Sequence, residues 1–265
     1  MRMMAVFEKS ERIRHIGHLD IQRSVQRGLR RSGLPVAYSN GFHPHILISF
    51  ASALSTGAAG KREIMDVTLA EPVTAERFLD AMNRAMPPVL RLLEARPLAD
   101  RAPALMTLVR AAVYDLRIDG DQEARRILGA VPAALARQEL RAMRKTKTKL
   151  EEIDIRPQSL GLNIPAAPAA GETPAAPAAG ETPAAPTAGE PPAVPAAGAP
   201  PAAPHLRAVL TLTETTSCKP GMLMEALSRE AGLAEVPRFV TTRLALLGED
   251  AEGRLIPLEK AAAES

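Results

Sequence analysis

Residues 17–45, GHLDIQRSVQRGLRRSGLPVAYSNGFHPH, carry the pattern that decides the fold of the first hundred residues. Apolar residues recur there at helical spacing, with arginines on the other face: Leu19, Ile21, Val25 and Leu29. Gly33 ends the helix because glycine readily adopts the left-handed conformation of a helix C-terminus. An extended stretch, LPVAY, and a break at SNGFHP follow. The pattern predicts a helix over 18–32, then an extended segment and a turn.

The segments around this helix alternate between strand and helix. Strands are predicted at residues 3–8, 45–51, 63–70 and 89–95. A second helix begins after Thr74, whose hydroxyl can cap it, and ends at Pro87-Pro88. The resulting order is that of the ferredoxin-like (βαββαβ) unit. We therefore expect residues 1–100 to form one such unit.

The second half of the chain repeats this order. Strands are predicted at 106–118, 137–155, 205–215 and 237–247, and helices at 121–129 and 220–231. Residues 104–248 are then expected to form a second ferredoxin-like unit, and residues 249–265 a flexible C-terminal tail. The expected fold class is α+β, with two ferredoxin-like (βαββαβ) units.

A low-complexity segment, residues 165–204, interrupts the second unit. It is rich in proline and alanine, and glycine recurs in it every nine residues, at Gly171, Gly180, Gly189 and Gly198. Such a composition buries too little apolar surface to offset the entropy that is lost on ordering. We expect a long disordered loop inside the second unit, and not a separator between domains.

The cysteine count and the hydropathy pattern exclude several classes of protein. Cys218 is the only cysteine, which excludes an intramolecular disulfide and cysteine-ligated zinc or iron–sulfur sites. No run approaches the roughly 18 apolar residues of a membrane helix. Charges come too early in residues 1–12 for the apolar core of a signal peptide. We expect a cytoplasmic protein with no membrane contact and no cofactor.

Positive charge gathers in two parts of the chain, whose formal net charge is +3. Lysine and arginine outnumber acidic residues in residues 1–45 and again in residues 137–149. Such clusters suit an anionic partner such as RNA. With only 5 Phe, 2 Tyr and no Trp, the aromatic ladder of an RNA-stacking sheet is missing. Contact with RNA would rest mainly on shape and charge.

The histidines of the opening stretch allow a metal site as one hypothesis. His18, His43 and His45 would act together with a carboxylate such as Asp20 or Glu63. Their spacing is common, and no HExxH-like pattern accompanies them. A metal site is therefore not favoured.

General acid–base chemistry, such as RNA cleavage, is the second hypothesis. A histidine titrates in the right range, and nearby arginines can stabilise a phosphorane-like charge. The sequence supplies no nucleophile with its base. An RNA-processing or metal-assisted hydrolytic enzyme that uses His18, Asp20, His43 and His45 is kept as the alternative function.

Binding without chemistry is the third hypothesis. The helix places Arg23, Arg27, Arg30 and Arg31 in a cationic stripe suited to phosphates. The plainer interpretation is a solvated helix face, with Asp20 meeting the helix dipole and Asn40-Gly41 forming a turn. The predicted substrate-binding residues are His18, Asp20, Arg27, Arg30, Arg31, Tyr38, Asn40, His43 and His45.

Residues 13–69 resemble a bacterial family of unknown function, the radical-SAM-associated proteins. The shared motifs stand in order as HLD, RRSGLP, YSNGFHPH and EIMDVTL, and EEIDIRP and KPGMLMEAL continue them in the second half. The matching positions are His18, Leu19, Asp20, Arg30, Arg31, Gly33, Pro35, Tyr38, Ser39, Gly41, Phe42, His43, Pro44, His45, Glu63 and Asp66. Gly17, His15, Ile46 and Gly60 depart from the pattern, and Gly17 removes a serine that is usual there.

The resemblance implies a partner enzyme, because in that family the domain is often fused to, or encoded beside, a radical SAM enzyme. With one cysteine the chain cannot hold the radical SAM cluster itself. The expected function is a non-catalytic accessory or substrate-binding protein that works with a radical SAM enzyme. It would present an anionic substrate such as RNA.

Overall fold

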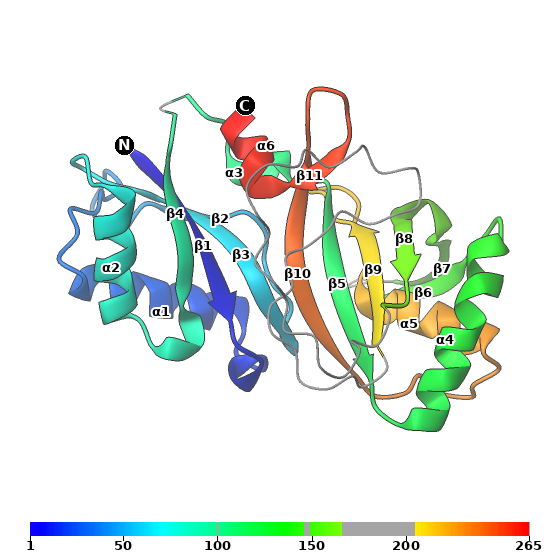
Figure 1. Ribbon diagram of the computed structural model, residues 1–265. Helices are drawn as coiled ribbons and strands as arrows, with labels where there is room; N and C mark the ends of the chain where they lie inside the picture. The colour runs from blue at the N-terminus through cyan, green and yellow to red at the C-terminus, as the bar shows by residue number, and fades with distance from the viewer. Residues whose placement is uncertain (100, 146–148, 166–204, 265) are drawn as a thin grey trace, which may run out of the picture. The chain divides into compact units, whose positions relative to one another are not determined.

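The computed structural model describes residues 1–99, 101–145, 149–165 and 205–264 (Figure 1). The chain divides into two compact units. Unit 1 comprises Met1–Val113, Leu212–Ser217 and Thr241–Ser265, and unit 2 comprises Tyr114–Thr211 and Cys218–Val240. Both mix helices with strands, so the predicted α+β class is confirmed. The finer assignment to ferredoxin-like folds stays a prediction, and nearly all of the predicted disordered loop lies outside the described residues.

Unit 1 begins with the predicted order of helices and strands. Its elements are β1 (Arg2–Lys9), η1 (Glu11–Ile13), α1 (His18–Arg31), β2 (Ile48–Phe50), β3 (Ala58–Thr68), α2 (Ala75–Ala85), η2 (Pro88–Leu90), β4 (Leu92–Leu98) and α3 (Leu105–Leu108). β1 pairs antiparallel with β4 on one side and with β3 on the other. β2 pairs antiparallel with β3. The helix predicted over 18–32 is confirmed to within one residue.

The helices α1 and α2 pack through most of the apolar positions that their sequence patterns predicted, but Leu19, in the first turn of α1, is 64% exposed. α1 buries Ile21, Val25 and Leu29, and α2 buries Phe78 and Met82. These side chains share one core with apolar residues of β1 and β3, including Met3, Ala5, Phe7, Met65 and Val67. Burying this face of α1 leaves its arginines on the opposite, solvent-facing side.

The chain returns to unit 1 in its last quarter, where a flexible tail was expected over 249–265. The elements there are β10 (Phe239–Glu249), β11 (Leu255–Pro257) and α6 (Leu258–Glu264). Thr241–Arg243 pair in parallel with the start of β3, and β11 pairs with β10. In place of a tail, α6 buries Leu258 and Ala261. A Cβ on Gly248 would lie 2.7 Å from the Cβ of Ala261, so the close approach of α6 requires glycine there.

Unit 2 contains the strand path β5-β9-β8 and a separate hairpin of β6 and β7. Its elements are β5 (Ala111–Ile118), α4 (Asp121–Ala136), β6 (Arg141–Lys145), β7 (Leu150–Asp154), η3 (Arg156–Gln158), β8 (Ser159–Asn163), β9 (His205–Thr211) and α5 (Pro220–Glu230). The strand predicted over 106–118 begins only at residue 111, because α3 takes up its first residues.

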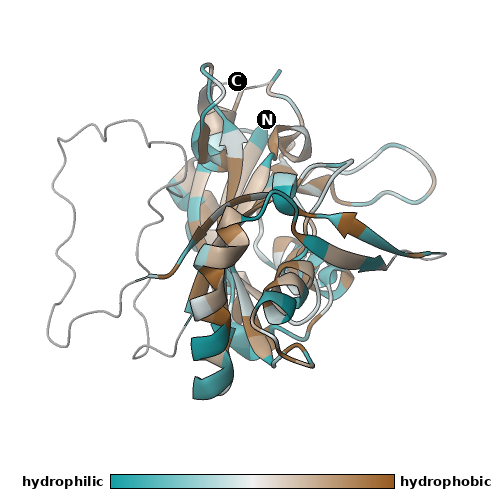
Figure 2. Ribbon diagram, turned by 90° about the vertical axis from the view of Figure 1, so that its right-hand side faces the viewer, coloured by the Kyte–Doolittle hydropathy of each residue, from teal (hydrophilic) through white to brown (hydrophobic). Residues whose placement is uncertain are grey.

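The helix α4 is longer than the sequence predicted, running to Ala136 and not to residue 129. Pro132 lies inside it and removes one backbone hydrogen bond. Its first turns are polar and its last turns apolar (Figure 2), and Val131 and Ala134 are buried there. The free energy gained by burying these side chains outweighs the helix-breaking tendency of the proline. The length of α4 is therefore set by tertiary packing.

Candidate functional site

A charged pair is buried in unit 1, between β3 and β10. Arg243 and Glu63 are 1% and 3% exposed. Arg243 Nε donates to Glu63 Oε1 at 2.8 Å, and Nη2 donates to Oε2 at 2.5 Å. The guanidinium also donates to the hydroxyl and carbonyl oxygens of Ser52 and to the carbonyl of Ala53. The pair therefore ties β10 and β3 to the segment after β2, across 180 residues of chain.

The Glu63 side chain lies across Gly60, an earlier residue of the same strand. A Cβ at Gly60 would lie 2.5 Å from Glu63 Cγ and 2.6 Å from Oε1. The pairing register of β1 and β3 also shifts here, between Phe7 and Lys9. Any larger residue at position 60 would push the carboxylate away from Arg243. Glycine at this position therefore allows the buried pair to form.

Lys9 and His18 lie beside this pair, and we call Lys9, His18, Glu63 and Arg243 the ionic cluster. Lys9 is 2% exposed, and its Nζ donates to the carbonyls of Arg14 and Ile16 at 3.0 and 2.9 Å. His18, the first residue of α1, meets the ring of Phe50 edge-on, with ring centres 5.0 Å apart. Lys9 thus holds the segment that leads into α1, and so fixes where α1 begins.

The ionic cluster perturbs the protonation of two of its members. Burial lowers the pKa of His18, Glu63 partly opposes this, and Arg243 and Lys9 add to it. Burial likewise lowers the pKa of Lys9, with Glu63 opposing and Arg243 reinforcing the shift. His18 is therefore a neutral imidazole at pH 7, with one nitrogen that can accept a hydrogen bond.

A small cavity adjoins the ionic cluster, between His18, Phe50, Ser52 and Glu63. Its volume of about 10 Å³ is near the least that one water molecule requires. Both carboxylate oxygens of Glu63 already accept hydrogen bonds from Arg243. An arrangement with so little room and an occupied carboxylate suits the positioning of α1 and β3 better than it suits the binding of a substrate.

The sequence pointed to two members of the ionic cluster and missed the other two. His18 and Glu63 stand in the motifs HLD and EIMD, whereas Lys9 and Arg243 carry no local signal. Lys9 and Arg243 are recognised only from their burial beside Glu63 in the structure. These contacts join residues that are far apart in the sequence. The second acid of the EIMD motif, Asp66, accepts a hydrogen bond from Arg2 at 2.7 Å and is also structural.

The arginines of α1 lie on its exposed face, as the helical spacing predicted. Asp20 pairs with Arg23 at 2.9 Å. Arg27 and Arg31 donate to uncharged oxygens, a serine hydroxyl at 3.3 Å and the carbonyl at the end of α2 at 2.7 Å. Arg30 is exposed as well. We call Arg27, Arg30 and Arg31 the arginine face, because these three cations keep their positive charge toward solvent.

The remaining predicted residues lie in or beside the turn over residues 39–45. Tyr38 forms a bridge with Ile46 across the base of this turn. Asn40, His43 and His45 are all exposed. The turn is short and closed, and its side chains point into solvent.

The structure does not bring His18 together with His43 and His45. His18 lies beside the ionic cluster with Glu63, whereas the turn follows the segment that bridges to Leu69 at the other end of β3. Six strand residues span about 20 Å. The segment after α1 carries the chain to Leu69, so the turn and His18 lie at different positions along β3. Within the described residues, no three His, Cys, Asp or Glu side chains are close enough to hold a metal ion.

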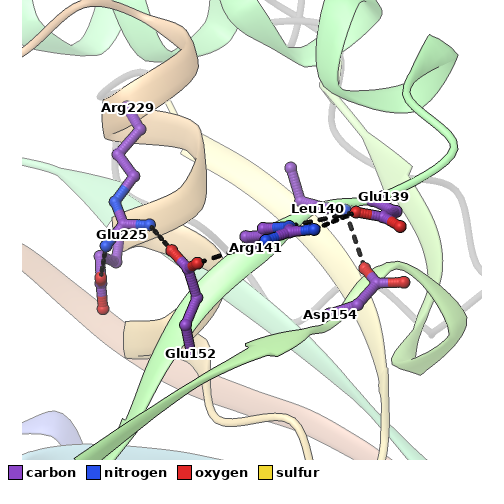
Figure 3. A network of polar contacts seen from close by, with 7 residues as sticks. All are labelled: Glu139, Leu140, Arg141, Glu152, Asp154, Glu225 and Arg229. Atoms are coloured by element: carbon purple, nitrogen blue, oxygen red, sulfur yellow. Dashed lines mark hydrogen bonds and ion pairs between the residues drawn. The ribbon is translucent and has the colours of Figure 1, made fainter.

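The second basic cluster, in unit 2, is largely compensated by carboxylates. Figure 3 shows the network that holds the β6–β7 hairpin against α5. Arg229 of α5 pairs with Glu225 at 2.7 Å and with Glu152 of β7 at 2.9 Å. Arg141 of β6 reaches the same Glu152 at 3.5 Å. Residues 146–148, between β6 and β7 in sequence, lie outside the described residues. Within the part of the chain that the structure describes, the arginine face of α1 is therefore the less compensated cationic surface.

Residues 2–176 match the model of a protein family described as "Uncharacterized protein conserved in bacteria (DUF2344)". The chain belongs to this family. No curated protein matches it. The matched range contains Lys9, His18, Glu63 and the turn, but it ends before Arg243. The buried pair thus joins a residue within the family match to one beyond it.

None of the helices that the structure describes combines the length and the apolar character that a membrane crossing requires.

Replacing Arg243 by methionine should leave Glu63 buried without its partner. We expect the free energy of unfolding to fall by about 3–5 kcal/mol, measured by urea denaturation. Arg254→Met in the same unit is the matched control, because that side chain is 52% exposed, whereas Arg243 is buried. A loss no larger than the control's would contradict the structural role of the pair.

The lowered pKa of His18 predicts a dependence of stability on pH. The unfolded chain regains the ordinary histidine pKa near 6.5, while the folded chain resists protonation. Stability therefore falls as pH decreases from about 6.5 toward the lower, folded pKa, because the unfolded state takes up the proton first. Chemical denaturation at a series of pH values should show that the free energy of unfolding of His18→Gln falls less steeply below pH 6.5 than that of the unsubstituted protein. The exposed His43→Gln should keep the original slope, and identical profiles for all three proteins would contradict the prediction.

Proposed function

We propose that this chain is a non-catalytic accessory protein that binds an anionic substrate, with RNA as the favoured class, and works together with a radical SAM enzyme. The observation that carries the binding part is the arginine face. Arg27, Arg30 and Arg31 are exposed on one helix, and the one carboxylate of α1, Asp20, is paired with Arg23. A row of uncompensated cations attracts phosphates along a nucleic-acid strand.

The rigid support of this helix also favours a binding role. The buried face of α1 belongs to the core of unit 1, and Lys9 holds the segment that leads into its first turn. Cations on a fixed helix meet a phosphate backbone with little loss of conformational entropy on binding. The plainer interpretation, a solvated helix face, gives no reason for three neighbouring cations without a matching carboxylate.

The partnership with a radical SAM enzyme rests on the resemblance of the HLD, YSNGFHPH and EIMD motifs. The chain's own chemistry is compatible with an accessory role. Cys218 is buried, and burial raises the pKa of its thiol to about 12, so it is a poor nucleophile at neutral pH. A substrate bound by this chain would be acted on by the partner.

The alternative, an RNA-processing or metal-assisted hydrolytic enzyme, receives no support from the geometry. Its four residues would have to lie within hydrogen-bond reach of one substrate. His18 adjoins the ionic cluster, Asp20 pairs with Arg23, and His43 and His45 lie in the turn at the other end of β3. These positions do not converge on one reacting group.

The double substitution Arg27→Glu/Arg30→Glu should weaken RNA binding and make it less dependent on salt. Each lost phosphate contact lowers the slope of log affinity against log salt by about 1, so the slope should fall by about 2. Fluorescence anisotropy with a labelled oligoribonucleotide at several salt concentrations measures both effects. Arg125→Glu/Arg238→Glu, at exposed positions of unit 2, carries the same change of charge and is the control. Equal losses of affinity in both variants, or an affinity that does not depend on salt concentration, would remove RNA from the proposal.

Affinity purification from a native host should test the partnership. The tagged chain is expected to retain an enzyme with a cysteine-ligated iron–sulfur cluster, identified by mass spectrometry and by its visible absorbance. RNA should be extractable from the same fraction, and Arg27→Glu/Arg30→Glu should retain the enzyme but lose the RNA. Recovery of the chain without any such enzyme would contradict the accessory role.

A further inference from the structure

The end of α2 meets the arginine-rich part of α1. Arg31 Nη2 donates to the carbonyl of Ala85, the last residue of α2, at 2.7 Å. Gly28 of α1 lies against Met86, and a Cβ at this position would collide with the methionine side chain. Glycine at this position therefore allows the end of α2 to contact α1. As a result Arg84, an exposed residue in the last turn of α2, lies beside the arginine face.

Two short 3-10 helices, η1 and η2, complete this end of unit 1 (Figure 1). Ser10 N, before η1, donates to the carbonyl of Val89 in η2 at 3.0 Å, and Glu8 N donates to the carbonyl of Arg91 at 2.8 Å. Arg12 of η1 and Arg91 after η2 are exposed. Four elements thus bring exposed arginines to one end of the unit. We call these arginines the cationic end: Arg12, Arg27, Arg30, Arg31, Arg84 and Arg91.

The carboxylates beside the cationic end already have other partners. They form the pairs Glu8–Lys61, Glu11–Arg14 and Asp20–Arg23. Within the part of the chain that the structure describes, no carboxylate forms an ion pair with an arginine of the cationic end. Asp80, one turn before Arg84 in α2, is exposed and offsets one of these charges. The cationic end therefore keeps a surplus of positive charge.

The positive charges of the cationic end cover an area and not a single line. Arg27 and Arg31 are one turn apart on α1, about 6 Å along its axis. Arg84 and Arg91 add charge from α2 and from the residue after η2. A single RNA strand offers one row of phosphates, whereas a duplex offers two. The major groove of an A-form duplex is deep and narrow, so the phosphates of its two strands lie close together.

The exposed aromatic rings of unit 1 lie elsewhere. Phe42 and Tyr38 are 101% and 47% exposed, and both follow the segment that bridges to Leu69, at the other end of β3. Among the residues that the structure describes, the cationic end has no exposed phenylalanine or tyrosine. Proteins that bind single strands use such rings to stack unpaired bases. The cationic end can therefore hold phosphates but offers no such ring for unpaired bases.

We infer that the cationic end of unit 1 binds double-stranded RNA. The arginine face contacts the phosphates of one strand, and Arg84 and Arg91 contact those of the other strand across the major groove. The inference rests on the proposed function and deepens it, because it names duplex RNA as the substrate class. It also adds residues outside α1 to the binding surface.

Arg84→Glu/Arg91→Glu tests the part of the surface that lies outside α1. We expect the Kd for a labelled RNA duplex to rise roughly 10- to 100-fold, because two charged contacts are lost. The slope of log affinity against log salt should fall by about 2. Fluorescence anisotropy at several salt concentrations measures both. Both side chains are exposed, so the variant should unfold at the same urea concentration as the unsubstituted protein.

Arg125→Glu/Arg238→Glu in unit 2 is the matched control, and it should bind the duplex as the unsubstituted protein does. The unsubstituted protein should also bind the duplex at least about 10-fold more tightly than either separated strand, because the duplex has the higher density of phosphates. An excess of unlabelled single strand should therefore displace little of the labelled duplex.

The possible results separate this inference from the proposed function. If the single strands bind as tightly as the duplex, or if Arg84→Glu/Arg91→Glu binds the duplex as well as the unsubstituted protein does, the inference is overturned and the RNA-binding role of the arginine face stands. If the unsubstituted protein binds neither form of RNA, the RNA-binding role itself fails. If Arg84→Glu/Arg91→Glu loses the radical SAM partner in affinity purification but still binds the duplex, these arginines dock a protein and the inference is wrong.

Discussion

The buried ion pair between Glu63 and Arg243 is the interaction on which unit 1 depends. Removing two charges from water costs several kcal/mol each, so such a pair persists only with good geometry and satisfied donors. Here two hydrogen bonds join the partners, and Ser52 and Ala53 accept the remaining donors of the guanidinium. The pair also makes β10 part of unit 1, because it links that strand to β3 and to the segment after β2.

The helix α1 has one end beside the buried ionic cluster and an arginine-rich face exposed to solvent. Its first turn adjoins the ionic cluster, where every charge has a partner or is suppressed by burial. Its last turn carries Arg30 and Arg31, whose charges are left facing solvent. His18 of the HLD motif therefore lies against the interior of the unit, and the side of the helix that we propose for binding is the face that the core does not use.

Local patterns predicted the elements that have strong periodicity. The helix over 18–32 and the helix after Thr74 have clear apolar faces, and the structure has both. The start of β5 and the end of α4 were predicted less well, since Val131 and Ala134 extend the helix by contacts that no local pattern shows. The C-terminal segment was expected to be a tail because a short, alanine-rich stretch gives no periodic signal. Its packing against Gly248 supplies the stability that its own sequence lacks.

The sequence by itself determined the α+β class, the cationic stripe of α1 and the turn chemistry of SNGFHPH. These follow from spacing and from residue types within a few turns of chain. Only the tertiary structure decided which of the marked residues meet. It joined His18 and Glu63 to Lys9 and Arg243, and it placed His43 and His45 at the far end of β3. Contacts across long stretches of chain depend on strand order and register, which the spacing of residues within one segment does not show.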